Sequence, residues 1–111
     1  MTPAENLARL GALTRLVLDV QLSRLHNAAA AREASLAHLA ALVPQAGAQG
    51  LLPVAQAQAE LAYDRWAEAR RAEINQVLAR QTADWLQARA DASLAFGRAD
   101  VLRKLAEKAR R

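Results

Sequence analysis

The sequence contains no cysteine and only three prolines, four glycines, one phenylalanine and one tyrosine among its 111 residues. Without cysteine the chain has no disulfide, no thiol chemistry and no thiolate metal site. No apolar run approaches the roughly 20 residues that a membrane-spanning helix needs, so we expect no transmembrane segment. The opening residues lack a basic region, which argues against a signal peptide and favours a cytoplasmic location.

The few helix breakers divide the chain into two long segments. The prolines stand at positions 3, 44 and 53, and the stretches between and after them are dominated by 29 alanines and 18 leucines, the strongest helix formers. Pro3 suits the first position of a helix, with Thr2 as N-cap and Glu5 completing a capping box. We therefore predict an all-α fold: a long antiparallel two-helix coiled-coil hairpin. Its helices cover about 3–42 and 53–110, its loop covers 43–52, and residues 1–111 form one domain.

Heptad spacing supports a coiled coil. Steps of three and four residues connect a predicted seam on the first helix, formed by Leu22, Leu25, Ala29, Arg32, Leu36 and Leu39. The same steps connect Ile74, Leu78, Gln81, Trp85, Ala88, Ala92, Ala95, Ala99, Leu102 and Ala106 on the second. With the loop centred near residue 48, antiparallel partners should have numbers that sum to about 97, which places Gly11 near Trp85. This register predicts a C-terminal overhang at about 94–111.

The sequence offers little for catalysis. His26 and His38 lie about 18 Å apart along one helix, too far to share a metal. The serines lack an oriented base at a suitable spacing, and Glu60 and Asp64 belong to an exposed helix face. We therefore expect no enzyme activity, no cofactor and no metal site.

Two surfaces could carry a binding function. The segment from Leu7 to Leu25 has nine large aliphatic residues among 19, more than one coiled-coil seam uses. It fits either a small three-helix core, made if the C-terminal segment folds back, or a docking surface. The last 18 residues contain six basic residues against two acidic ones and so account for the net charge of +4. They fit either a solvated helix C-terminus or a site for an acidic partner.

Trp66 is the less regular of the two tryptophans. Trp85 falls on the predicted seam, whereas Trp66 could lie on an outer face with Arg70 one turn on, a composition typical of binding hot spots. The complete set of predicted partner-binding residues is Arg98, Arg103, Lys104, Lys108, Leu10, Leu13, Val17, Trp66 and Arg70.

Three segments give the chain a family resemblance. They are 7–10 (LARL), 66–71 (WAEARR) and 103–111 (RKLAEKARR). With the hairpin architecture they resemble the flagellar export protein FliJ and its YscO-type counterparts in type III secretion. The resemblance implies a cytoplasmic coiled-coil stalk, peripheral to the inner membrane. It also implies protein partners, namely a hexameric export ATPase, bound through the end that carries the termini, and the export gate.

Two other functions fit the same residues. Two hairpins could form a homodimeric helical bundle through the Leu7–Leu25 stripe, which would make the chain a structural oligomerisation module. The basic tail could instead bind an anionic surface peripherally. Nucleic acid is a poor candidate because the basic residues form no single stripe and few aromatics are available to stack on bases.

Overall fold

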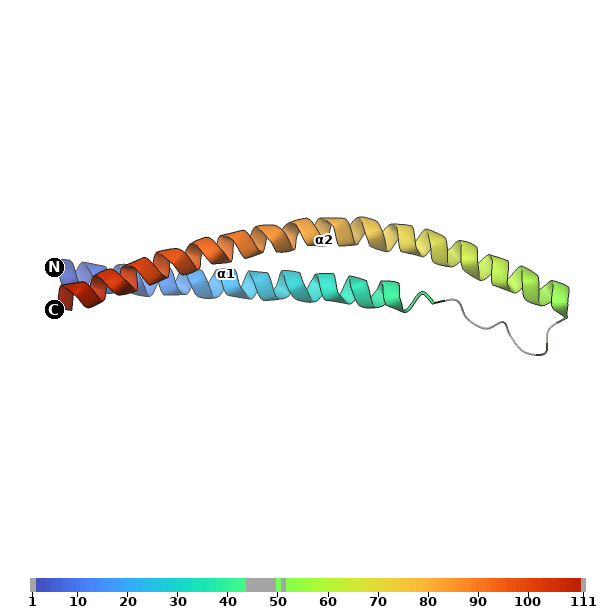
Figure 1. Ribbon diagram of the computed structural model, residues 1–111, viewed down its shortest axis with the longest axis horizontal. Helices are drawn as coiled ribbons and strands as arrows, with labels where there is room; N and C mark the ends of the chain where they lie inside the picture. Colours follow the sequence, from blue (N-terminus) through green and yellow to red (C-terminus); the bar gives the residue numbers. More distant parts are fainter. Residues whose placement is uncertain (1, 44–49, 51, 111) are drawn as a thin grey trace. The chain divides into compact units, whose positions relative to one another are not determined.

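The computed structural model describes residues 2–43, 50 and 52–110. It contains two helices, α1 (Pro3–Ala40) and α2 (Pro53–Arg110), and no strand within these residues (Figure 1). The all-α fold and the start of each helix are confirmed, while α1 ends two residues earlier than expected. The predicted loop, 43–52, lies largely outside the described residues. At the start of α1, the Glu5 amide donates to the Thr2 hydroxyl and the Thr2 amide donates to the Glu5 carboxylate, as a capping box requires.

The chain divides into two compact units, and each helix contributes to both. Unit 1 consists of Met1–Ala30 and Ala83–Arg111, and unit 2 consists of Ala31–Thr82. In unit 1, the beginning of α1 lies beside the end of α2 (Figure 1), and Arg24 pairs with Asp91 at 4.0 Å. In unit 2, Arg32 donates to the Thr82 hydroxyl at 3.1 Å. The helical segments of each unit therefore run antiparallel, as a two-helix hairpin requires.

The seam of α2 agrees with the sequence prediction. Every predicted position from Ile74 to Ala106 is buried or half-buried. The most deeply buried side chains are Ala88, Ala92 and Ala95 in unit 1, and Ala67 and Ile74 in unit 2. None of the described side chains is completely buried. Most of the deeply buried residues of the seam are small, and they remain slightly accessible to solvent.

The seam of α1 is shifted from the predicted one. Leu22 is 47% exposed, so its assignment to the seam was wrong. The half-buried and buried positions that recur with alternating steps are instead Leu7, Gly11, Thr14, Leu18, Gln21, Leu25 and Ala28, continued in unit 2 by Arg32, Ser35 and Leu39. Ala29 and Leu36 flank this line and are half-buried. The prediction failed because polar residues occupy seam positions, which an apolar pattern alone passes over.

The register also differs from the prediction. The pairs Arg32–Thr82, Ser35–Gln81 and Arg24–Asp91 have residue numbers that sum to between 114 and 116, not about 97. Residues 99–110 consequently line a shared hollow with residues 4–15, so the predicted overhang at 94–111 was wrong and Gly11 lies near Ala106 rather than Trp85. The estimate failed because it assumed arms of equal length on both sides of the loop.

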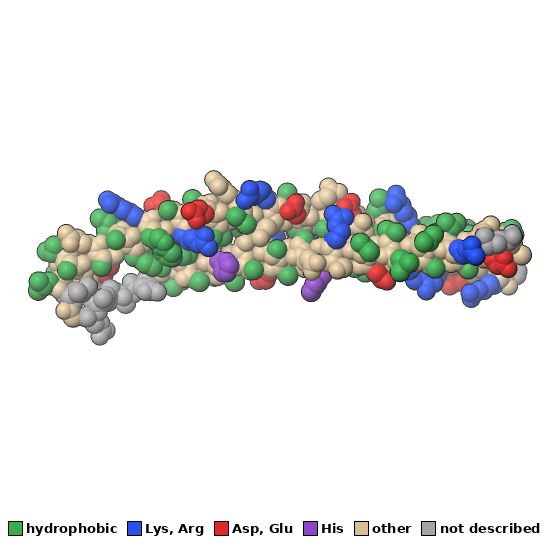
Figure 2. Space-filling view, turned by 180° about the vertical axis from the view of Figure 1, so that it is seen from behind, with side chains coloured by type: hydrophobic (Ala, Val, Ile, Leu, Met, Phe, Trp, Pro, Cys, Tyr) green, Lys and Arg blue, Asp and Glu red, His purple; other side chains and the backbone are tan. Residues whose placement is uncertain are grey.

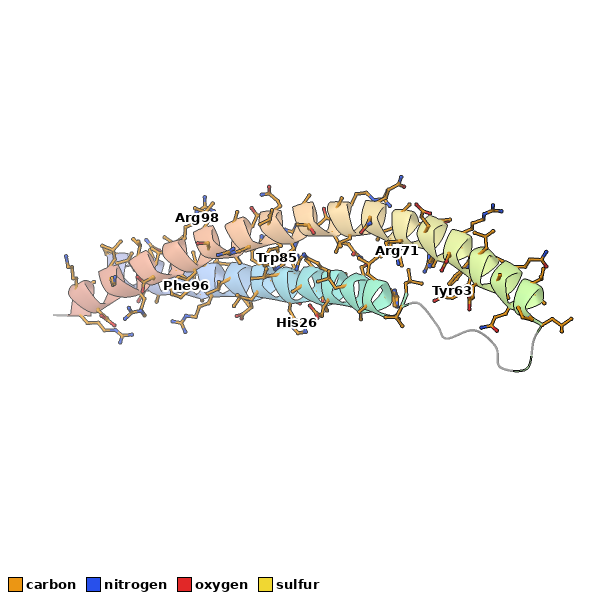
Figure 3. The ribbon with its side chains drawn as sticks, turned by 45° about the vertical axis from the view of Figure 1, so that its right-hand side comes forward. His26, Tyr63, Arg71, Trp85, Phe96 and Arg98 are labelled. Carbon is orange, nitrogen blue, oxygen red and sulfur yellow. The ribbon has the colours of Figure 1, made fainter. Side chains whose placement is uncertain are left out.

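In unit 2, the start of α2 extends past the end of α1. In unit 2, the hydroxyl of Tyr63 on α2 donates to the carbonyl of Val43, which follows α1, at 3.1 Å. About two helical turns further along α2, Arg71 donates to the Leu42 carbonyl at 3.3 Å. Both side chains reach from α2 toward the end of α1 (Figure 3). Both acceptors belong to residues that follow α1, so these hydrogen bonds join the segment after α1 to α2.

Candidate functional site: an apolar face of unit 1

The ion pair between Arg24 and Asp91 defines one edge of the helix pair in unit 1. In a coiled coil the same edge returns every seven residues. Moving from Arg24 toward the start of α1, this edge carries Val17 and then Leu10. Moving from Asp91 toward the end of α2, it carries Arg98 and then Leu105. The two helices therefore present these residues on the same side.

Aliphatic residues extend this edge outward on both helices. Residues three positions further along each helix lie beside the edge on the outer surface. We define the apolar face as the following exposed side chains: Leu10, Leu13, Leu16, Val17 and Val20 on α1, and Leu94, Val101 and Leu105 on α2. Leu13 is 58% exposed and Val101 is 56% exposed, so these large side chains lie largely uncovered. Figure 2 shows hydrophobic side chains gathered over unit 1 with Lys and Arg side chains around them.

A shallow groove runs along the α2 side of the apolar face. Its lining residues are Ala90, Ser93, Leu94, Gly97, Arg98 and Val101. Gly97 lies within α2, and a Cβ built on it would meet nothing within 4 Å. Packing inside the described part of the chain therefore does not require a glycine at this position.

The predicted basic residues differ in the ion pairs that they form. Arg103 donates to Asp100 at 2.9 Å and to Glu107 at 2.8 Å, and Lys104 pairs with Asp100 at 3.0 Å. The hydrogen bonds from Arg103 and Lys104 lower the pKa of Asp100 below its usual value. The hydrogen bond to Asp100 and the charge of Glu107 raise the pKa of Arg103. Much of the charge of this pair is thus balanced within α2.

Arg98 and Lys108 remain as exposed cations: Arg98 lies on the shared edge within the apolar face, and Lys108 lies beyond Leu105 at its end. Arg98 leaves α2 on its solvent side, whereas Phe96 leaves it in another direction (Figure 3). Lys108 lies ten residues further along, close to three turns of helix. These two residues, rather than Arg103 and Lys104, give the face its available positive charge.

The other edge of unit 1 holds a hollow of about 240 Å³ where α1 begins and α2 ends. Its floor consists of small residues from both helices, including Gly11, Ala99 and Ala106. Glycine opposite alanine leaves the seam unfilled here, which explains the hollow. Arg15, Arg103 and Arg110 stand around it together with Glu107, so its surroundings are net positive.

The remaining predicted residues belong to unit 2. Trp66 is 55% exposed and lies outside the seam, with its ring centroid 5.8 Å from that of Tyr63. Arg70 pairs with Glu73 at 3.2 Å on the same helix. Trp85, by contrast, is half-buried on the seam, as predicted, and the Arg89 guanidinium lies 5.8 Å from its ring centre.

Six of the nine predicted partner-binding residues therefore lie on or beside the apolar face: Leu10, Leu13, Val17, Arg98, Lys104 and Lys108. Arg103 lies at the hollow on the opposite edge, and Trp66 and Arg70 belong to unit 2. Their role in binding stays a prediction. Leu94, Val101, Leu105 and Gly97, which share this side with the α1 stripe, were not among the predicted residues. Their own seven-residue recurrence could have identified them, but only the register shows that they share a side with α1.

The described residues contain no group of three or more metal-ligating side chains. His26 is exposed and points away from α2 (Figure 3). In the described range, neither helix contains a segment long and apolar enough to cross a membrane.

The fold and the face place the chain in the general class of antiparallel coiled-coil hairpins. No protein-family model matches it, and neither the curated proteins nor the solved structures include a significant match.

Proposed function

We propose that this chain is a non-enzymatic coiled-coil adaptor that binds a protein partner through unit 1. The single observation that carries the proposal is the apolar face, on which large aliphatic side chains of both helices stand exposed side by side. Monomeric proteins rarely expose contiguous apolar patches of this kind, and those that are rimmed by charged residues typically bind other proteins. The partner surface that fits is aliphatic and carries carboxylates, because Arg98 stands within this face and Lys108 stands at its end.

The resemblance to FliJ and the YscO-type proteins suggests the more specific form of this proposal. In that form the chain is a stalk of a flagellar or type III export apparatus, and the partner is the hexameric export ATPase. Two features support it: the beginning of α1 and the end of α2 meet in unit 1, and the arginines around the hollow make that end net positive. A cytoplasmic location, peripheral at the inner membrane beside the export gate, belongs to the same proposal.

The test is a pull-down with purified export ATPase at low and at moderate salt. Leu13→Arg places a charge in the middle of the apolar face and should reduce capture at least tenfold. Phe96→Arg is the matched control, because Phe96 is 62% exposed but lies on another side of α2. Capture by the control should match that of the unmodified chain. Equal capture by both variants would show that the apolar face is not the binding surface.

A charge-reversed variant tests the basic border. Arg98→Glu combined with Lys108→Glu changes the charge beside the apolar face without touching the Asp100 pairs, and it should weaken binding most at low salt. No capture of the unmodified chain at any salt concentration would exclude the export ATPase. Flotation with vesicles that contain anionic lipid would then reveal whether the basic residues serve a membrane surface instead.

A further inference from the structure

We propose that the hollow of unit 1, where α1 begins and α2 ends, is a second binding site that receives one large aliphatic side chain of an acidic partner helix. The hollow has a volume of about 240 Å³ and lies on the edge opposite the apolar face. It is thus separate from that face, and its role does not depend on whether the face is an interface.

The hollow is an unfilled position on the seam of the coiled coil. Gly11 of α1 lies near Ala99 and Ala106 of α2, and none of these residues has a side chain larger than a methyl group. A Cβ built on Gly11 would meet nothing within 4 Å, so packing within the described residues does not require a glycine here. An interior glycine weakens a helix. The small residues leave open a hole of the kind into which a side chain of another helix fits.

The size of the hollow favours a side chain over a free ligand. Pockets for small molecules typically have volumes of about 300–1,000 Å³, and this hollow is smaller. A single large side chain that enters a pocket is a common anchor in protein–protein recognition. Leu7 and Leu102 contribute apolar walls to the hollow, so the anchor that fits is aliphatic.

The ion pairs leave two cations available at the hollow. Arg103 and Glu107 both line it, but they are paired with each other at 2.8 Å, and Arg103 also pairs with Asp100. Arg15 and Arg110 are exposed, line the hollow, and form no ion pair within the part of the chain that the structure describes. These two arginines therefore supply the positive charge of the hollow, and they favour a partner that carries carboxylates.

The positions of the two arginines predict the spacing of those carboxylates. Arg15 follows Gly11 by four residues on α1, and Arg110 follows Ala106 by four residues on α2. Because the two helices run antiparallel and Gly11 lies near Ala106, the arginines stand at opposite ends of the hollow, about 12 Å apart along the axis. A partner helix with a leucine over Gly11 would reach both arginines with carboxylates placed one turn before and one turn after that leucine.

Fluorescence anisotropy with a labelled peptide tests the site on the full chain. The probe is a synthetic alanine-rich helix with one leucine and a glutamate four residues to either side of it. Gly11→Leu fills the hollow and should raise the dissociation constant at least tenfold. Gly97→Leu is the matched control, because it makes the same change at an interior glycine that lines the groove beside the apolar face, and it should leave the constant unchanged.

Circular dichroism verifies that both variants remain helical. Equal affinity of the two variants would overturn the inference. Absence of binding to the unmodified chain at about 1 mM peptide would also overturn it.

Further variants separate the contribution of charge from that of the anchor. Arg15→Gln and Arg110→Gln should each weaken binding about threefold, whereas Arg9→Gln should not, because Arg9 is exposed on α1 but does not line the hollow. A peptide with alanine in place of its leucine should bind at least tenfold more weakly. Equal binding of that peptide would show that the arginines attract charge alone and would refute an anchored site. Leu13→Arg should not weaken peptide binding, so failure of this site and failure of the proposed function are distinguishable.

Discussion

The hydrogen bond between Ser35 and Gln81 on the seam of unit 2 allows a quantitative prediction about stability. The Ser35 side chain is 7% exposed, and its hydroxyl donates to Oε1 of Gln81 at 2.5 Å. Ser35→Ala removes the donor and leaves the carbonyl oxygen of Gln81 on the seam without it. A neutral hydrogen bond contributes about 1 kcal/mol net, and a group left unsatisfied and only partly hydrated adds to the loss. We therefore expect Ser35→Ala to lower the free energy of unfolding by about 1–1.5 kcal/mol.

Urea denaturation followed by circular dichroism at fixed protein concentration measures this change. With a denaturant slope of about 2 kcal/mol per molar, the unfolding midpoint should fall by roughly 0.6 M. The matched control is Ser23→Ala, because Ser23 is exposed on the same helix. Its midpoint should move by less than about 0.2 M, since exposed substitutions of this kind change stability little.

A double-mutant cycle separates the hydrogen bond from the loss of side-chain packing. Ser35→Ala and Gln81→Ala should be non-additive by about 0.5–1 kcal/mol, because each variant removes the same interaction. If the double variant loses the sum of the two single losses, or if Ser35→Ala and Ser23→Ala shift the midpoint equally, then this hydrogen bond does not stabilise the seam.

Three further predictions concern other parts of the chain. Thr2→Ala removes the acceptor of the Glu5 amide and should cost about 1 kcal/mol in the same urea assay; an unchanged midpoint would refute a stabilising capping box. Ala92→Leu should cost about 1–3 kcal/mol by overpacking the seam, whereas Ala90→Leu, on the exposed side, should cost little; equal effects would contradict the assigned seam. Because Asp100 has a lowered pKa in the folded chain, its pairs stabilise the end of α2 above its unfolded pKa, and this contribution disappears as the pH falls through the folded value. Helicity should therefore decline below about pH 4, and Asp100→Asn should remove that part of the decline; an identical pH profile for the variant would refute the assignment.

The start of each helix was predictable because local chemistry determines it. Pro3 and Pro53 fix where the two helices begin, and the Thr2–Glu5 capping box needs only residues close in sequence. The α2 seam was also predictable, since alanine recurs there with a regular heptad spacing against charged neighbours. These features depend on short-range order and on the period of the helix.

The register was not predictable in the same way. It depends on which residues of two distant segments meet, and the deciding contacts are polar: Arg32 with Thr82 and Ser35 with Gln81. A search for apolar spacing assigned Leu22 and Leu36 to the α1 seam because it could not anticipate that Gln81 would provide a partner for Ser35. Polar groups on a seam often specify alignment at a cost in stability. Since the register was wrong, the side that α1 and α2 share could not be identified from the sequence either.

The placement of residue sizes in unit 1 connects its packing to its proposed role. Alanines fill much of the α2 seam, which lets α1 approach but contributes little apolar burial per residue. The larger side chains of Leu13, Val17 and Val101 stand on the outer side, where the hairpin itself leaves about half of their surface exposed. Exchanging the two sets would bury more apolar surface within the hairpin and would leave only small alanine side chains on the outer side. A chain that instead uses its small residues for its own seam and leaves its large ones outside gains most of its apolar burial only when another helix covers that side. This is the distribution expected of a module whose stability and function both depend on association.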